Sequence, residues 1–151
     1  FGLVYKTGYR SIQTSAVIRN FGPEISFSDD EITTNNNDFE SYPPPQTLAI
    51  GVSGFLIAPE NSLFFLSRNQ SLRAAFDIIG PRDYDQQYNT GLEWGYQDLL
   101  FLRTGYKFNY DTQGISFGMG LRFNNFRGDY SYASYGKYLL NIHRISAGIE
   151  F

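Results

Sequence analysis

The only histidine of this sequence, His143, is the residue through which any serine-based hydrolysis would have to run. The chain has no cysteine, which removes thiolate nucleophiles, disulfides and cysteine-ligated metals together. We expect no nucleophile elbow, since that motif needs a strand, a sharp turn and a helix. The glycines of "GISFGMG" at 114–120 do not predict a phosphate loop, because no helical pattern follows them. These residues predict a protein that is not an enzyme and uses no cofactor.

Acidic and amide residues are concentrated in one long segment, 22–46. Its "SDDE" at 28–31, with further acids and asparagines over 35–40, could hold Ca²⁺ through oxygen ligands. The segment lacks the ligand spacing and the central glycine of a calcium-binding loop. We therefore expect a solvated loop without a metal, which returns to the next strand through the stiff "YPPPQ" at 42–46.

Charged residues recur at alternate positions through the second half of the chain, the spacing that puts side chains on one face of a strand. Such a face could line a permeation path or bind a polar ligand. It could also be structural, because opposite charges in a low-dielectric interior neutralise one another. We expect the structural role, and no metal site. The ten residues are Arg73, Asp77, Glu93, Arg103, Lys107, Arg122, Arg127, Asp129, Arg144 and Glu150.

The composition narrows the class of protein that could carry these residues. Aromatic residues make up 18% of the 151 residues, yet the mean hydropathy is -0.33 and no apolar run approaches the roughly 20 residues of a membrane-spanning helix. A helical membrane protein is excluded, whereas a membrane β-barrel is not, because alternation hides its hydropathy. The net charge of -3 and the pI near 5.0 offer no basic surface for nucleic acid. The lack of cysteine suits passage through an oxidising periplasm.

Alternation between large apolar residues and small or polar residues, interrupted by turn residues, predicts an all-β protein with about nine strands. In "YNTGLEWGYQ" at 88–97, for example, the bulky residues share one face, and glycine, asparagine and glutamate share the other. The nine strands lie near 1–8, 11–21, 47–58, 71–80, 87–96, 99–109, 114–124, 126–134 and 142–151.

Two architectures fit this alternation. A soluble sandwich or a lipocalin-like barrel would point the large apolar residues inward and the charges to water. An outer-membrane barrel would point the large residues to lipid and enclose the charges in its lumen. Because the polar face is rich in glycine, carries both signs of charge and is flanked by tyrosine-rich strand ends, the sequence favours the antiparallel transmembrane barrel.

The lengths of the connections point the same way. Outer-membrane barrels alternate short periplasmic turns with longer outer loops. Counting back from a periplasmic C-terminus, the connections near 8–10, 96–98 and 124–125 should be periplasmic, and they are short. Those at 22–46, 80–87, 109–114 and 134–141 should be outside, and they are longer; only the periplasmic 58–70 departs from the rule.

The last strand alternates to its final residue, and Ile149 with Phe151 resembles the aromatic-ended signal for outer-membrane insertion. That signal commonly has glycine where this chain has Ser146, with Gly148 displaced. Phe1 already lies within a predicted strand, and bacterial single-chain barrels have an even number of strands and no open edge. We therefore expect 1–151 to be the C-terminal part of a single barrel domain, with further strands before it.

The chain resembles the PorV/PorQ family of outer-membrane proteins over nearly its whole length. The resemblance rests on an "NFGP" turn entering the long loop, the proline-rich return, a "GLEW" strand, an "LRTGY" strand and the closing "HR" strand. That family is similar in fold to the long-chain fatty-acid transporter barrels, which have 14 strands, so about nine C-terminal strands would be present here. In the Bacteroidetes, PorV-type members belong to the type IX secretion system and pass cargo to a surface attachment complex.

The resemblance implies a protein of the bacterial outer membrane, surrounded by lipid, that binds secretion-system or cargo proteins. We expect the outer loops to do this work, chiefly 22–46. A transporter for hydrophobic compounds is the alternative, with Phe55, Ile79 and Phe101 as its inward apolar residues, and a surface lattice protein is a third possibility. The residues expected to bind the partner are Asp29, Asp30, Glu31, Phe39 and Tyr42.

Overall fold

The computed structural model describes residues 1–24, 42–136 and 140–150. These residues form one ten-stranded sheet, and no helix occurs among them. No helix in this described part is therefore long and apolar enough to cross a membrane. The strands are β1 Gly2–Lys6, β2 Gln13–Arg19, β3 Thr47–Ala58, β4 Phe65–Leu66, β5 Gln70–Pro81, β6 Gln87–Tyr96, β7 Leu100–Phe108, β8 Ile115–Phe123, β9 Phe126–Ala133 and β10 Ile142–Ile149.

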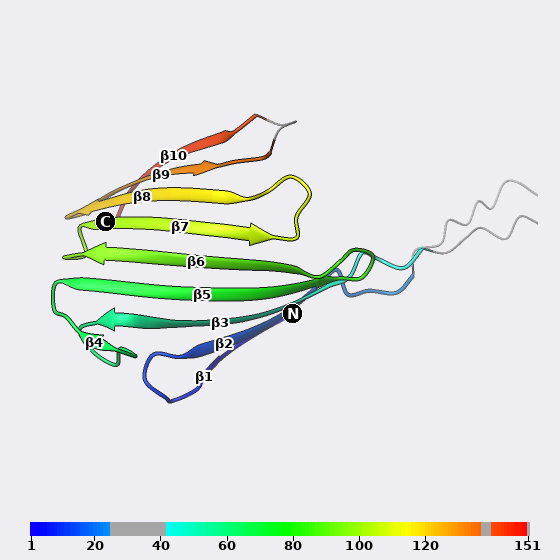
Figure 1. Cartoon of the computed structure of the whole chain (residues 1–151), viewed down its shortest axis with the longest axis horizontal. Helices are drawn as coiled ribbons and strands as arrows, with labels where there is room; N and C mark the ends of the chain where they lie inside the picture. The colour runs from blue at the N-terminus through cyan, green and yellow to red at the C-terminus, as the bar shows by residue number, and fades with distance from the viewer. Residues whose placement is uncertain (25–41, 137–139, 151) are drawn as a thin grey trace, which may run out of the picture.

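The long strands lie side by side in the order of the chain, and each pairs antiparallel with the next (Figure 1). The all-β, antiparallel prediction is thus confirmed, and the nine long strands occupy the predicted ranges to within a few residues. The two-residue β4 was not predicted. It lies in the connection 59–69 and pairs with β3 in parallel, Ile57 opposite Phe65 and Ala58 opposite Leu66. This short strand explains why 58–70 is longer than the other connections at its end of the sheet.

The antiparallel order sorts the connections to two ends of the sheet (Figure 1). The short-turn end holds 7–12, 59–69, 97–99 and 124–125, and the long-loop end holds 20–46, 82–86, 109–114 and 134–141. The three-residue turn between β6 and β7 has Gln97 and Asp98 at φ of 50° and 54°. Two successive residues with positive φ are typical of a type I′ hairpin turn, whose twist matches that of the flanking strands.

Strand pairing gives the sheet two chemically different faces. The apolar face carries rungs such as Trp94, Leu102 and Met119, whose Cα atoms are paired across β6, β7 and β8. The charged face carries the alternate rungs, such as Glu93 and Arg103. In the described part of the chain, Ala58 at 5% exposure is the one buried hydrophobic residue, whereas Phe117 is 49% and Ile149 is 55% exposed. The apolar face therefore has no protein layer over it among these residues.

The sheet described here is not closed. β1 is paired only with β2, and β10 only with β9, as far as the described residues show. Each of these edge strands leaves alternate backbone amide and carbonyl groups without a strand partner.

Candidate functional site

Arg103 is the centre of an ion-pair network on the charged face. Its Nε lies 2.6 Å from Glu93 Oε2 on β6, and its Nη1 lies 2.8 Å from Asp129 Oδ1 on β9. The second oxygen of Asp129 lies 2.8 Å from Arg127 Nε. Two guanidinium groups and two carboxylates thus neutralise one another across β6, β7 and β9. Four of the ten charged residues predicted to share this face are brought together here.

The network depends on glycines in the strand that it crosses. Arg103 on β7 reaches Asp129 on β9 by passing over β8, where Gly118 and Gly120 occupy the charged face. A Cβ atom on Gly120 would lie 2.8 Å from Asp129 Oδ1 and 3.3 Å from Arg103 Nη1. The first contact is shorter than real Cβ contacts and the second is tight, so glycine at position 120 gives the ion pair its room.

Three further cations of this face have neutral neighbours. The guanidinium of Arg73 donates to Ser53 Oγ at 3.0 Å and lies over the ring of Phe55. The guanidinium of Arg122 lies over the ring of Phe101, 5.5 Å from its centroid. The ammonium of Lys107 donates to Gln113 Oε1 and lies 5.1 Å from the centroid of the Tyr110 ring. None of these three has a carboxylate partner among the described residues.

The other predicted charges lie apart from the network. Asp77 extends over Gly51 of the neighbouring strand. Arg144 lies on β10 opposite Ser131. Glu150 follows β10, and its backbone is tied to Asn125 by an amide donated to Asn125 O at 2.8 Å. In the described ranges, no three histidine, aspartate or glutamate side chains come close enough together to hold a metal ion.

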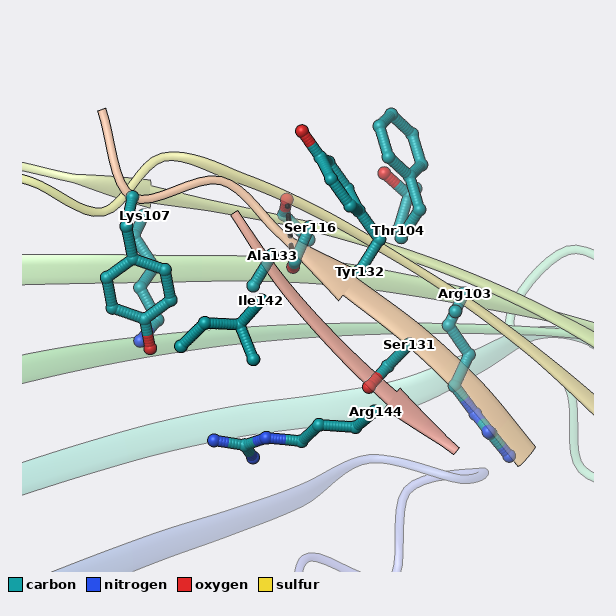
Figure 2. Close-up of a pocket in the computed structure, with 13 residues that line it drawn as sticks. Arg103, Thr104, Lys107, Ser116, Ser131, Tyr132, Ala133, Ile142 and Arg144 are labelled. Carbon is teal, nitrogen blue, oxygen red and sulfur yellow. Dashed lines mark hydrogen bonds between the residues drawn. The ribbon is translucent and has the colours of Figure 1, made fainter. Parts of the chain in front are cut away.

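The charged face contains a hollow of about 380 Å³ bounded by β7, β8, β9 and β10. Figure 2 shows Lys107, Ile142 and Arg144 on one side of these strands, and Thr104 and Tyr132 on the other. The polar groups that line the hollow come from Arg103, Lys107, Ser116, Ser131, Tyr135 and Arg144. The sequence predicted that Arg103, Lys107 and Arg144 share a charged face, but it did not predict the hollow between them.

The residues expected to bind a partner fall mostly outside the described residues. Asp29, Asp30, Glu31 and Phe39 lie there, as does Phe151 of the expected insertion signal. Tyr42 is described, at the return of the long connection to β3, and is 59% exposed. Ile149 lies on the apolar face opposite Phe126, while Ser146 and Gly148 lie on the charged face opposite Asp129 and Arg127.

His143 has two tyrosine neighbours. Its Nδ1 lies 2.8 Å from Tyr130 Oη, and its ring centroid lies 5.3 Å from that of Tyr132. The segment "GISFG" at 114–118 does have the spacing G-x-S-x-G, but Ser116 lies in the ladder of β8 and its Oγ donates to Gly105 O at 3.3 Å. It therefore does not form a nucleophile elbow, which needs a strand-to-helix turn.

Aromatic residues gather toward both ends of the apolar face. Near the short-turn end, the rings of Trp94 and Tyr96 are stacked with centroids 6.0 Å apart. Near the long-loop end, the rings of Tyr106 and Phe108 meet edge to face at 4.5 Å. Leu92 and Thr104, which are paired across β6 and β7, lie between these two groups. A band of this kind is typical of the lipid-facing side of membrane barrels.

Comparison with known proteins identified no relative. No family model matches the chain, and neither the curated proteins nor the solved structures gave a match.

Proposed function

We propose that this chain forms part of an outer-membrane β-barrel, with the apolar face against lipid and the charged face toward the lumen. The observation that carries the proposal is the contrast between the faces. Large apolar side chains such as Phe117 and Ile149 are about half exposed, while Arg103 and Glu93 pair with each other on the opposite face. In a soluble sandwich a second sheet would cover the apolar face, because burial of that face provides the stability of such a fold. No such sheet covers it among the described residues.

The strand lengths support the same proposal. A membrane-crossing strand needs about 9–11 residues. β6, β7 and β8 have 10, 9 and 9 residues, β3 and β5 are slightly longer with 12 each, and β9 and β10 are slightly shorter with 8 each. In lipid the free edges of β1 and β10 would leave backbone groups without partners. We propose that additional strands join these edges, in keeping with the 14-stranded barrels that the resemblance implies.

We propose that the barrel is not an enzyme and that its long loops bind secreted cargo or another protein of the type IX secretion system. The support is the resemblance to the PorV/PorQ family, together with the position of the longest connection, 20–46, at the same end of the sheet as 82–86, 109–114 and 134–141. With that end outward, the C-terminus would be periplasmic. The alternative, a transporter of hydrophobic compounds, needs an apolar lumen, yet the rings of Phe55 and Phe101 each lie beneath a guanidinium group.

The orientation of the faces can be tested by labelling, because the chain has no cysteine. Met119→Cys would present a label on the apolar face, and Ser131→Cys would present one on the charged face. In bilayers whose lipid chains carry a quencher, we expect the fluorescence of a label at position 119 to be quenched and that of a label at position 131 to be preserved. Equal quenching at both positions, or the reverse order, would remove the basis of the membrane proposal.

The partner-binding role needs a separate experiment. Deletion of 28–41 should leave membrane insertion intact and abolish the co-purification of partner proteins in mild detergent. A variant in which the same residues are replaced by an equal number of glycines and serines controls for loop length. If partners are retained by both variants, the long loop does not bind them. If an apolar compound is taken up and no protein co-purifies, the transporter alternative is correct.

A further inference from the structure

The hollow on the charged face has an excess of positive charge. Arg103, Lys107 and Arg144 contribute to its lining, and no carboxylate is among the described residues that line it. The Arg103 guanidinium is already neutralised by Glu93 and Asp129. Lys107 and Arg144 are not, since neither has a carboxylate within ion-pair distance in the part of the chain that the structure describes.

Among the described residues, no carboxylate lies within ion-pair distance of either cation. Lys107 is paired across the sheet with the neutral Asn89, and Asp77 is one strand further away. Its ammonium contacts the amide oxygen of Gln113 and the ring of Tyr110, which are both neutral. Arg144 is paired across the sheet with Ser131. Two cations without a carboxylate partner at one hollow give it a positive potential, which raises the local concentration of anions.

The floor of the hollow leaves room for such an anion. Gly105, Gly118 and Ala133 line it and carry little or no side chain. The hydroxyl groups of Ser131 and Tyr135 can donate hydrogen bonds from its walls, and Ile142 provides one apolar side. Arginine, lysine and hydroxyl donors around a small space are a set that suits the oxygens of a phosphate group.

We propose that the hollow between β7 and β10 binds a phosphate group, held by Arg144 and Lys107 with hydrogen bonds from Ser131 and Tyr135. Lys107 lies near the end of β7, Tyr135 follows β9 by two residues and Ile142 begins β10, so the site lies toward the long-loop end of the sheet. The binding groups lie within the paired strands β7 to β10 and the residues that adjoin them. The proposal therefore goes beyond partner binding by the loops and does not depend on it.

Titration of the intact protein in detergent with inorganic phosphate, followed by ³¹P NMR line width, tests this site. We expect binding by the unaltered protein, and an affinity lower by about tenfold or more in Arg144→Gln and in Lys107→Gln, since each loses a hydrogen bond from a charged group. Arg144→Lys should recover part of the affinity. Arg122→Gln is the matched control, because Arg122 is on the same face, lacks a carboxylate partner among the described residues and does not line the hollow.

Two results would overturn the proposal. One is the absence of phosphate binding by the unaltered protein. The other is an equal loss in Arg122→Gln, which would mean that phosphate responds to the general charge of the face. A parallel titration with a soluble short-chain phosphatidylglycerol in place of inorganic phosphate identifies the source of the phosphate group. Binding of this lipid that is weakened in Arg144→Gln would make it a lipid headgroup, and no binding of this lipid would make it a soluble phosphate. Neither titration includes a protein partner, so its result does not depend on whether residues 28–41 bind one.

Discussion

A charge placed on the apolar face should destabilise the protein strongly in lipid, and the same charge on the opposite face should not. Met119 is the residue to change, because it lies at the middle of β8, four residues from Ile115 and four from Phe123. At about 3.3 Å per residue it is roughly 13 Å from each end of its strand, which is close to the middle of a hydrocarbon layer about 30 Å thick. Its cross-strand neighbours are Leu102 and Tyr130, and neither can compensate a charge.

Arginine at this depth on a lipid-facing surface costs about 2–4 kcal/mol in the free energy of unfolding. We therefore expect Met119→Arg to be less stable by that amount when the protein is refolded into phospholipid bilayers and titrated with denaturant. The matched control is Ser146→Arg, which adds the same side chain to the charged face opposite Asp129. Because Ser146 is exposed on the polar face, the cost of the new arginine should stay within about 1 kcal/mol.

Two results with these variants would contradict the proposed orientation of the faces. If Met119→Arg is as stable as the unaltered protein, the apolar face does not contact lipid. If Ser146→Arg is the more damaging of the two, the faces are oriented as in a soluble sandwich, and the proposed secretion role loses its structural basis. A requirement of the assay is that both variants refold with the same change in far-ultraviolet circular dichroism as the unaltered protein.

Three further predictions concern the network and the turn, each measured as the free energy of unfolding in the same bilayers. Asp129→Asn should cost about 1 kcal/mol, because two partly exposed guanidinium groups lose their shared carboxylate; Glu150→Gln, whose side chain is exposed, should change it by less than about 0.5 kcal/mol. Gly120→Ala should cost roughly 1–3 kcal/mol through overpacking against the ion pair. Gly128→Ala is the control and should be tolerated, because nothing lies within 4 Å of its Cβ position. Equal costs for the two variants would contradict the role given to position 120. Asp98→Gly should stabilise the protein by a few tenths of a kcal/mol, since glycine adopts the φ of 54° without strain. A loss of stability would show instead that the aspartate side chain supports the turn.

The sorting of side chains to two faces was predictable from the sequence, because a strand has a period of two whatever its neighbours are. For that reason the charged residues predicted to share a face do so wherever they lie in a described strand, from Arg73 on β5 to Arg144 on β10. The ends to which the connections belong were predictable as well, since antiparallel order alternates them. The two-residue β4 was not predictable, because a parallel pairing of Phe65 and Leu66 leaves no periodic signal.

The partners of each charge were decided only by the tertiary structure, since alternation says which face a residue occupies and not which residue stands beside it. The register of four strands places Glu93 next to Arg103 and lets the guanidinium cross Gly118 and Gly120 to reach Asp129. The same register leaves Lys107 and Arg144 around a hollow with no described carboxylate. Sequence periodicity is a local property of one strand, whereas neutralisation of charge depends on distances between strands that are far apart in the chain.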